Sequence, residues 1–247
     1  MTGFLASVNA LKEAYIALQA GVNVIDLKEP ANGVLGAVPV STLREVVKLI
    51  AGHCLVSATV GDLPGDPGVI SKACVEIASR GVDIVKVGLF DTDNRAAVFE
   101  TLAGQARDGI QIVVVLFADR QPAPEYVLTE IAESGLTGVM LDTVNKQGKS
   151  LRHYCTDPQL AAFIEKGKEL GLVTGLAGSL RVEDIEPLLN LRPDYLGFRG
   201  ALCLGNSRQN SIDPIAVRSI RRRIPNQTSS LEDRIWANEH AKQRPLP

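Results

Sequence analysis

Short apolar runs alternate with amphipathic segments along most of the chain. The runs are rich in Val, Ile and Leu, and several are apolar on both faces, which is typical of parallel strands covered on both sides. We expect strands at residues 4–8, 22–28, 54–60, 82–88, 111–117, 137–142, 172–178 and 194–200. We expect helices at residues 9–20, 41–51, 67–80, 92–107, 124–134, 156–170, 182–191 and 213–222.

The order of these elements predicts the fold. Eight strand–helix units follow one another without a break in composition, which is the pattern of an α/β fold with a single closed (β/α)8 TIM barrel. A doubly wound open sheet is the alternative, but no G-x-G-x-x-G motif follows the first strand, which argues against a dinucleotide-binding sheet. We expect residues 1–222 to form the barrel and residues 223–247 a short polar C-terminal tail. Trp236 would anchor this tail on the barrel or on a neighbouring subunit.

Composition and charge narrow the class of protein. Of the 247 residues 45% are hydrophobic and 4% are aromatic, so the chain can bury a sizeable aliphatic core. The net charge of −2 gives no argument for binding nucleic acid or an acidic membrane surface, and no apolar run approaches the ~18 residues of a membrane span. The N-terminus lacks a basic secretory signal, and the four cysteines are far apart without a C-x-x-C pair. We therefore expect reduced thiols in a cytoplasmic protein.

Four charged residues lie in, or directly after, otherwise apolar strands: Asp26, Lys28, Lys86 and Asp142. Side chains alternate between the two faces of a strand. Counted from the glycine that precedes each strand, all four residues have the same parity and a late position. Active sites of such barrels lie at the carboxyl ends of the strands, so we expect these side chains to converge at the barrel mouth. The alternatives are that Lys28 is a surface loop residue and that Lys86 is a structural lysine in an ion pair.

Two lysines with two carboxylates suit amine catalysis. A lysine in a water-poor pocket, or beside another cation, has a lowered pKa. Its neutral amine can attack an aldehyde or ketone to form a Schiff base, and a second lysine or a carboxylate can then move a proton on the neighbouring carbon. The loop after the sixth strand adds Lys146 and Lys149. These two either close over an anionic substrate or belong to a solvated polar loop.

The seventh and eighth strands end in small residues. In such barrels the loops after these two strands often bind phosphate through backbone N–H groups. We expect Gly178 and Ser179 to form one half of a phosphate site and Gly200 and Ala201 the other half, with Arg199 as a fork-shaped partner. Ordinary turn geometry is the alternative explanation of the glycines.

The three histidines give no sign of a metal site. His53, His153 and His240 do not stand at metal-ligand spacing from one another. His53 precedes the third strand, which is the wrong end of a barrel for catalysis, and we interpret His153 as a loop residue. We therefore expect no metal, and nothing in the sequence indicates a cofactor.

Five segments together resemble one enzyme family. They are DLKEPANGVLGA (26–37), VDIVKVGL (82–89), MLDTVNKQGKSL (140–151), LAGSL (176–180) and GFRGALC (197–203). In this order they are similar to (5-formylfuran-3-yl)methyl phosphate synthase, a family that makes the furan precursor of methanofuran. The motifs run from about residue 4 to residue 208.

The resemblance implies a (β/α)8 barrel lyase that condenses two molecules of glyceraldehyde 3-phosphate with loss of phosphate and water. Carried over to this chain, Lys28 forms the Schiff base and Lys86 accepts a proton, with Asp26, Asp142 and Lys146 around them. The glycine-rich ends of the last two strands would hold phosphate, as expected above from the residues alone.

Two other functions stay open. A class I aldolase or phosphosugar isomerase would share the barrel and the phosphate-binding site. A non-catalytic barrel would bind a phosphorylated metabolite without turnover. We expect a homo-oligomer with a triose phosphate as its small-molecule partner. Glu29 departs from the family pattern, because archaeal members have asparagine there, and this difference could alter the first loop.

Overall fold

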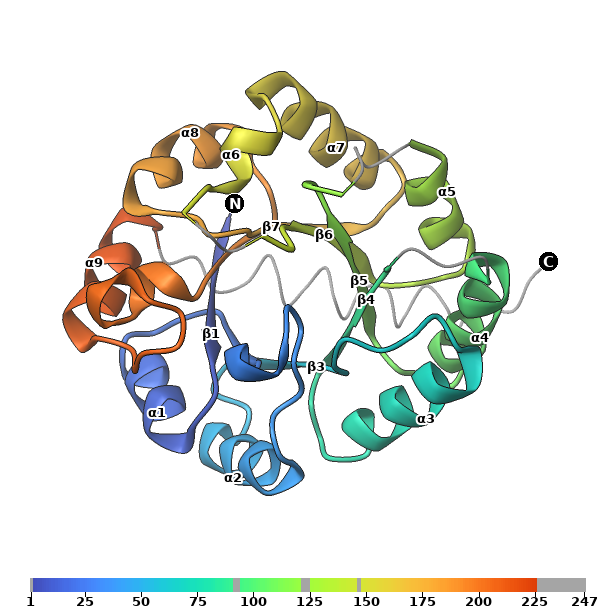
Figure 1. The fold of residues 1–247 in the computed structure, drawn as a ribbon, viewed down its shortest axis with the longest axis horizontal. Coiled ribbons are helices and arrows are strands. Elements are labelled where there is room, and N and C mark those ends of the chain that lie inside the picture. The colour runs from blue at the N-terminus through green and yellow to red at the C-terminus, as the bar shows by residue number, and fades with distance from the viewer. Residues whose placement is uncertain (1, 91–93, 121–124, 146–147, 226–247) are drawn as a thin grey trace.

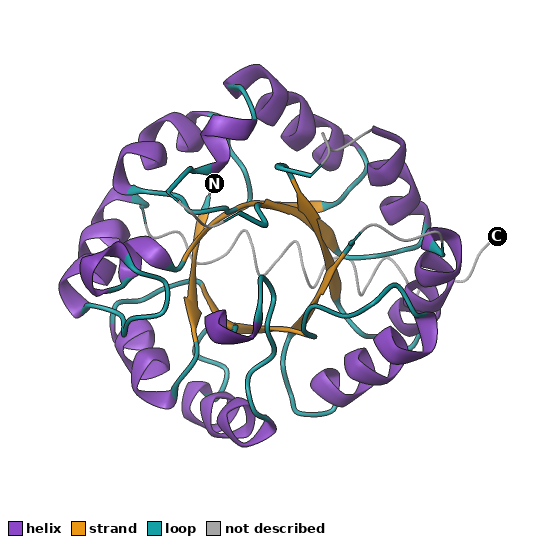
Figure 2. Cartoon of the chain, in the orientation of Figure 1, coloured by secondary structure: helices purple, strands orange, loops and turns teal. Residues whose placement is uncertain are grey.

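A computed structural model describes residues 2–90, 94–120, 125–145 and 148–225. Within these residues, eight parallel strands are hydrogen-bonded in sequence order, and the last strand pairs with the first to close a barrel. Helices surround this ring of strands (Figures 1 and 2). The predicted (β/α)8 barrel is confirmed, and the open sheet is excluded.

Each connection between consecutive strands contains a helix. The strands are β1 (Gly3–Val8), β2 (Val24–Leu27), β3 (Leu55–Thr59), β4 (Ile84–Gly88), β5 (Ile112–Phe117), β6 (Gly138–Asp142), β7 (Val173–Leu176) and β8 (Tyr195–Phe198). The α-helices are α1 (Leu11–Gln19), α2 (Val40–Ile50), α3 (Pro67–Ala78), α4 (Arg95–Arg107), α5 (Glu125–Glu133), α6 (Leu151–Tyr154), α7 (Asp157–Glu169), α8 (Ile185–Asn190) and α9 (Pro214–Arg223). Short 3-10 helices are η1 (Pro30–Asn32), η2 (Val182–Asp184), η3 (Gly200–Leu202) and η4 (Leu204–Asn206).

The observed elements differ from the predicted ones mainly at their ends. β2 covers only Val24–Leu27 of the expected strand 22–28, so Lys28 directly follows it. The expected helix 182–191 divides into η2 and α8, and the connection after β6 contains an additional helical turn, α6. Hydrogen-bonded pairing with neighbouring strands decides where a strand ends, and periodicity along the sequence carries little information about it.

The carboxyl end of the described chain packs on the barrel. α9 ends at Arg223, and Ile224 after it is fully buried. The packed region therefore continues just beyond the expected boundary at residue 222. Residues 226–247, which include Trp236 and most of the expected tail, lie outside the described residues. None of the described helices is long and apolar enough to cross a membrane.

Two layers of apolar side chains stabilise the barrel. The outer layer lies between strands and helices and includes Ile25 and Val85. The inner layer fills the barrel and includes Val24, Ile84 and Met140. These three residues have the parity that the sequence predicted to point inward. Two positions further along each of the same three strands lies one of the charged residues of the site.

Candidate active site

A fully buried carboxylate, Asp26, lies at the centre of the charged group. In the register of the sheet it is opposite Ser7 of β1 and Ser57 of β3. Both serine hydroxyls donate a hydrogen bond to Asp26 at 2.7 Å. Lys86 of β4 also donates to it, with a distance of 3.0 Å from Nζ to Oδ1. Donors from β1, β3 and β4 therefore hold this carboxylate in one position.

Burial and charge shift the pKa values of this ion pair. Burial alone would raise the pKa of Asp26, but the charges of Lys86 and Lys28 and the hydrogen bonds from Ser57 and Ser7 hold it below its ordinary value. Burial lowers the pKa of Lys86, Asp26 opposes this shift, and the charge of Lys28 adds to it. The pair thus combines an ionised carboxylate with an amine that loses its proton more readily than a lysine in water.

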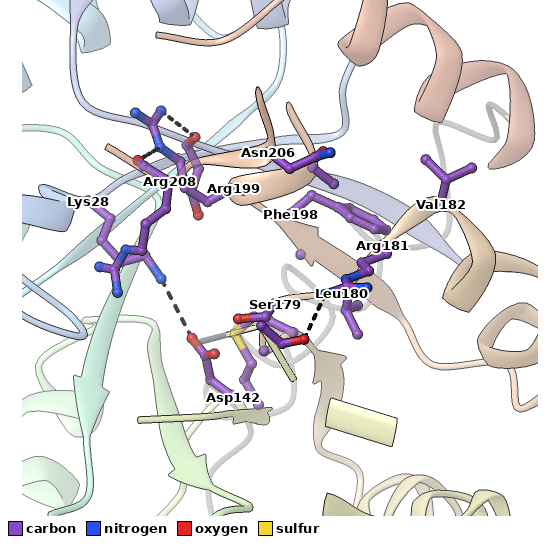
Figure 3. A pocket seen from close by; sticks show the side chains of 18 of the residues that line it. Lys28, Asp142, Ser179, Leu180, Arg181, Val182, Phe198, Arg199, Asn206 and Arg208 are labelled. Atoms are coloured by element: carbon purple, nitrogen blue, oxygen red, sulfur yellow. Dashed lines mark hydrogen bonds and ion pairs between the residues drawn. The ribbon is translucent and has the colours of Figure 1, made fainter. Parts of the chain in front are cut away.

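The second lysine, Lys28, pairs with the second aspartate. Its Nζ lies 3.5 Å from Oδ2 of Asp142 at the end of β6 (Figure 3). The exposed fractions are 0% for Asp26, 7% for Lys28, 2% for Lys86 and 2% for Asp142. The predicted convergence of the four side chains is confirmed, and Lys28 is not a surface residue.

Hydrogen bonds fix the loop that carries Lys28. The N–H of Glu29 donates to the carbonyl of Gly36 at 2.8 Å, and Thr59 Oγ1 donates to the same carbonyl at 3.0 Å. The carboxylate of Asp62 accepts hydrogen bonds from two backbone N–H groups of this loop, those of Val34 and Leu35, at 2.7 and 2.6 Å. A Cβ atom at position 36 would lie 2.3 Å from the carbonyl oxygen of Glu29, so only glycine fits there. The base of the loop is therefore held in one conformation, which orients Lys28 before any substrate binds.

The side chain of Glu29, the position that departs from the family pattern, is bound to its own loop and to the loop after β1. Its carboxylate accepts hydrogen bonds from the N–H of Ala31 at 3.0 Å and from Nδ2 of Asn9 at 3.2 Å. It thereby caps η1, which lies over the ring of strands in the view of Figure 2. The departure at position 29 therefore leaves both lysine–aspartate pairs intact.

Lys28, Lys86 and Asp142 line a cavity of about 470 Å³, which is within the usual size of a small-molecule site. The loop after β7 lines another side of it through Gly178, Ser179 and Leu180 (Figure 3). The N–H groups of these loop residues have no hydrogen-bond acceptor among the described residues. Both Gly178 and Ser179 have positive φ, 103° and 51°. Successive N–H groups in such a turn form a concavity that suits an anion.

Gly200 and Ala201 line the same cavity from η3, directly after β8. Both halves of the predicted phosphate site therefore face one space, together with the two lysines. Phosphate binding by these residues remains a prediction, and the described turn at positions 178–179 provides the clearest anion-binding geometry.

Arg199 does not have the geometry expected for a phosphate ligand. Its Nη1 and Nη2 bind the Glu13 carboxylate at 2.5 and 3.4 Å. Its remaining donors bind the carbonyls of Arg208, Ser7 and Asn210 at 2.9, 3.2 and 3.1 Å. These contacts use all five N–H donors of a guanidinium. The prediction that Arg199 binds phosphate with two parallel N–H groups is therefore wrong. The side chain instead forms an internal contact that joins α1 to the loop after β8.

Removing the charge of Glu13 should destabilise the fold. In Glu13→Gln the buried Arg199 loses its counter-charge, and we expect a loss of about 3 kcal/mol in the free energy of unfolding. For a chain of this size that corresponds to a fall in melting temperature of roughly 6–12 °C, measured by calorimetry.

The matched control is Glu76→Gln. Glu76 forms an ion pair with Arg80 at 3.8 Å, but its side chain is 49% exposed, against 6% for Glu13. An exposed pair of this kind contributes less than about 1 kcal/mol. Equal melting temperatures for the two variants would contradict a stabilising role of the Glu13–Arg199 pair.

Arg208 also lines the cavity, although it was not among the residues predicted for the site. Its Nη2 donates to the carbonyls of Pro30 and Gly33 at 3.2 and 2.7 Å. Arg208 thus connects the loop after β8 to the loop that carries Lys28. Its position at residue 208, where the matching motifs end, was the one available signal, and that position does not reveal a contact with a loop so distant in sequence.

For Lys146, Lys149 and His153, the predictions from the sequence have different outcomes in the structure. Lys146 lies outside the described residues. Lys149 is exposed and does not line the cavity. His153 belongs to α6, so its interpretation as a loop residue was wrong. Among the described residues, no group of three or more His, Cys, Asp or Glu side chains is arranged to hold a metal ion.

Comparison with known sequences identifies relatives along most of the chain. The sequence model of the 4-HFC-P synthase family matches residues 4–221. A protein of Methylorubrum extorquens, provisionally named (5-formylfuran-3-yl)methyl phosphate synthase, is 41% identical over 86% of this chain and 87% of its own length. The (5-formylfuran-3-yl)methyl phosphate synthase of Methanocaldococcus jannaschii is 36% identical over 88% of this chain and 97% of its own length.

Solved structures share the fold at low sequence identity. Phosphoribosyl anthranilate isomerase from Thermus thermophilus aligns with a TM-score of 0.64 and 15% identity, covering 91% of this chain and 98% of that one. A 3-hexulose-6-phosphate synthase aligns with a TM-score of 0.62 and 17% identity, covering 91% of this chain and all of that one. These likenesses support the barrel architecture alone.

Proposed function

The chain belongs to the 4-HFC-P synthase family, and on that premise we propose that it condenses two molecules of glyceraldehyde 3-phosphate to 4-(hydroxymethyl)-2-furancarboxaldehyde phosphate. The enzyme would be a carbon–oxygen lyase that acts on phosphates, and its product would supply the biosynthesis of methanofuran or a related carrier. The observation that carries this proposal is the pair of buried lysines, each within 3.5 Å of an aspartate and both lining one cavity.

The overall chemistry balances without an added oxidant or reductant. Two triose phosphates contain the atoms of the furan aldehyde phosphate, one phosphoric acid and two waters. One triose keeps its phosphate and takes the dihydroxyacetone form, whereas the other loses its phosphate from its third carbon. The new carbon–carbon bond joins that third carbon to the middle carbon of the first triose. Ring closure and loss of the two waters then give the furan.

Lys28 is the residue proposed to form the Schiff base. It borders the cavity and its amine has one aspartate neighbour, Asp142, at 3.5 Å. Once protonated, the imine withdraws electrons from the adjacent carbon and makes a proton there acidic. Asp142 provides a negative charge beside that positive nitrogen, which stabilises the iminium form.

Lys86 is the residue proposed to accept that proton. Burial lowers the pKa of Lys86, so a larger fraction of its amine is neutral near pH 7 than for a lysine in water. Asp26 holds this amine at 3.0 Å and is itself fixed by Ser7 and Ser57. Asp26 therefore acts as a positioning residue that also sets the proton affinity of Lys86.

Phosphate binding is proposed for the turn after β7. Gly178, Ser179 and Leu180 line the cavity, and their N–H groups have no protein acceptor among the described residues. They can bind one phosphate of the reacting pair, with Gly200 and Ala201 on the neighbouring wall.

The direct test is product formation from glyceraldehyde 3-phosphate alone. We expect a conjugated furan aldehyde, with strong near-ultraviolet absorbance, and one inorganic phosphate released per furan formed. An aldolase or an isomerase would give neither signal, and a binding protein would be stabilised by triose phosphate without turnover. Absence of the furan from a folded preparation would contradict the proposed function.

A further inference from the structure

Arg208 is a cation of the cavity wall with unused hydrogen-bond donors. Its Nη2 binds the carbonyls of Pro30 and Gly33, but its Nε and Nη1 have no acceptor within the part of the chain that the structure describes. Burial lowers its pKa, which the charge of Asp142 partly opposes. A partly buried guanidinium with free donors on a cavity is a favourable partner for an anion.

The backbone of Arg208 is held in place by the side chain of Arg199. Its carbonyl accepts a hydrogen bond from Nε of Arg199 at 2.9 Å, and Arg199 is in turn bound to Glu13 of α1. The buried Glu13–Arg199 pair is thus a support for the loop that carries Arg208. The guanidinium that the sequence suggested for phosphate binding supports another guanidinium that faces the cavity.

The proposed reaction needs two separate anion sites. Two triose phosphates bring two phosphate groups into one cavity, and like charges repel at short range in a partly buried space. The turn at residues 178–180 lies after β7, whereas Arg208 contacts the loop after β2. β8 and β1 lie between these two strands in the barrel. In the view of Figure 3, Arg208 and Lys28 are on the same side of the cavity, away from Ser179.

We propose that Arg208 binds the phosphate that is lost, namely that of the triose joined to Lys28, while the turn at residues 178–180 binds the phosphate that the product keeps. This inference rests on the proposed function. A triose is short, so an imine at its first carbon and a phosphate on its third carbon require two binding groups close together. Lys28 and Arg208 line the same cavity, and the carbonyls that Arg208 binds belong to the loop that carries Lys28.

Arg208 would act during the elimination step. Lys86 takes the proton from the carbon next to the imine, and the freed electron pair forms a carbon–carbon double bond. The bond between the third carbon and the phosphate oxygen breaks, and the phosphate leaves with that electron pair. Negative charge grows on the departing oxygen, and a charged hydrogen bond from a free N–H donor of the Arg208 guanidinium stabilises such charge.

The test compares Arg208→Gln and Arg208→Lys with the wild type. We expect Arg208→Gln to lower kcat/KM for glyceraldehyde 3-phosphate about 100-fold and to weaken product inhibition by inorganic phosphate. Arg208→Lys should lose about tenfold, because an ammonium keeps the charge but not the planar arrangement of donors that binds both the loop carbonyls and the anion. Arg218→Gln is the matched control, since Arg218 is exposed on α9 and does not line the cavity.

A trapping experiment separates anion binding from simple support of the Lys28 loop. Borohydride reduction with glyceraldehyde, which carries no phosphate, should label Lys28 equally in wild type and Arg208→Gln. Labelling with glyceraldehyde 3-phosphate at low concentration should fall in the variant only. Equal loss with both aldehydes would mean that Arg208 only holds the loop, and unchanged kcat/KM would mean that it has no role; either result overturns the inference.

The inference can fail independently of the proposed function. If the wild type made no furan, thermal stabilisation by inorganic phosphate would still test Arg208, because binding to the folded state raises the melting temperature. A smaller stabilisation of Arg208→Gln than of Arg218→Gln would support anion binding. Identical stabilisation of the two variants would overturn it.

Discussion

Replacing Lys28 with arginine is expected to lower furan formation by about four orders of magnitude or more. A guanidinium stays protonated at any pH used in assays and cannot form an imine. The substitution keeps a positive charge next to Asp142, which lies 3.5 Å from the native amine, so the fold should be retained. The measurement is the initial rate of near-ultraviolet absorbance increase with glyceraldehyde 3-phosphate.

Lys166→Arg is the matched control for this variant. Lys166 forms a surface pair with Glu169 at 3.7 Å on α7 and does not line the cavity. It undergoes the same chemical change, and we expect its rate to stay within about twofold of the wild type. Substantial furan formation by Lys28→Arg, with a melting temperature equal to that of the control, would show that Lys28 is not the nucleophile.

The second large effect is expected at Lys86. In Lys86→Arg the ion pair with Asp26 can persist, but the guanidinium cannot accept a proton, and we expect kcat to fall about 1000-fold. The imine at Lys28 should still form, because it does not need this base. Borohydride should therefore trap an adduct on Lys28 in the variant. Loss of both turnover and adduct would contradict a role confined to proton transfer.

Arginine is larger than lysine, and Lys86 is only 2% exposed, so Lys86→Arg could lose activity through poor packing alone. A second variant separates this effect from the loss of the base. The double change Asp26→Asn with Lys86→Met removes both charges of the pair and leaves no buried ion without its partner. It should also trap the adduct on Lys28 while producing little furan. Agreement between the two variants would assign the loss of turnover to the missing base rather than to packing.

The pH profile of the wild type gives an independent check on Lys86. A base must be neutral to act, so kcat should rise with pH as Lys86 loses its proton. Burial lowers the pKa of Lys86, and this rising limb should lie below the ordinary lysine pKa of about 10.4. Asp26→Asn should move the limb to still lower pH, because Asp26 opposes the shift. A limb at or above the ordinary lysine value would contradict the assignment.

The inward face of the strands could be predicted from the sequence because strand geometry has a period of two residues. Val24, Ile84 and Met140 fill the barrel, and the charged residues that follow them at the same parity meet at its mouth. Lys28 also lies on the predicted side of the chain, although β2 ends one residue earlier. The N–H of Lys28 still donates to the carbonyl of Val8 in β1 at 3.0 Å, so the pairing of the two strands continues to this residue.

The loop contacts could not be predicted in the same way. Arg199 follows the end of β8 and has a ψ of −66°, so the alternation of an extended strand no longer sets the direction of its side chain. Its partner Glu13 is 186 positions away in sequence, and no local pattern marks such a pair. Arg208 was missed for the same reason, since its contacts with Pro30 and Gly33 depend on how two loops meet at the barrel mouth.

The most direct measurement is the site of covalent labelling. Wild-type protein is mixed with glyceraldehyde 3-phosphate, reduced with borohydride, digested and analysed by mass spectrometry. The account predicts that the sugar-derived mass lies on the peptide containing Lys28, at that residue. A reduced adduct found on another lysine and absent from Lys28 would contradict it.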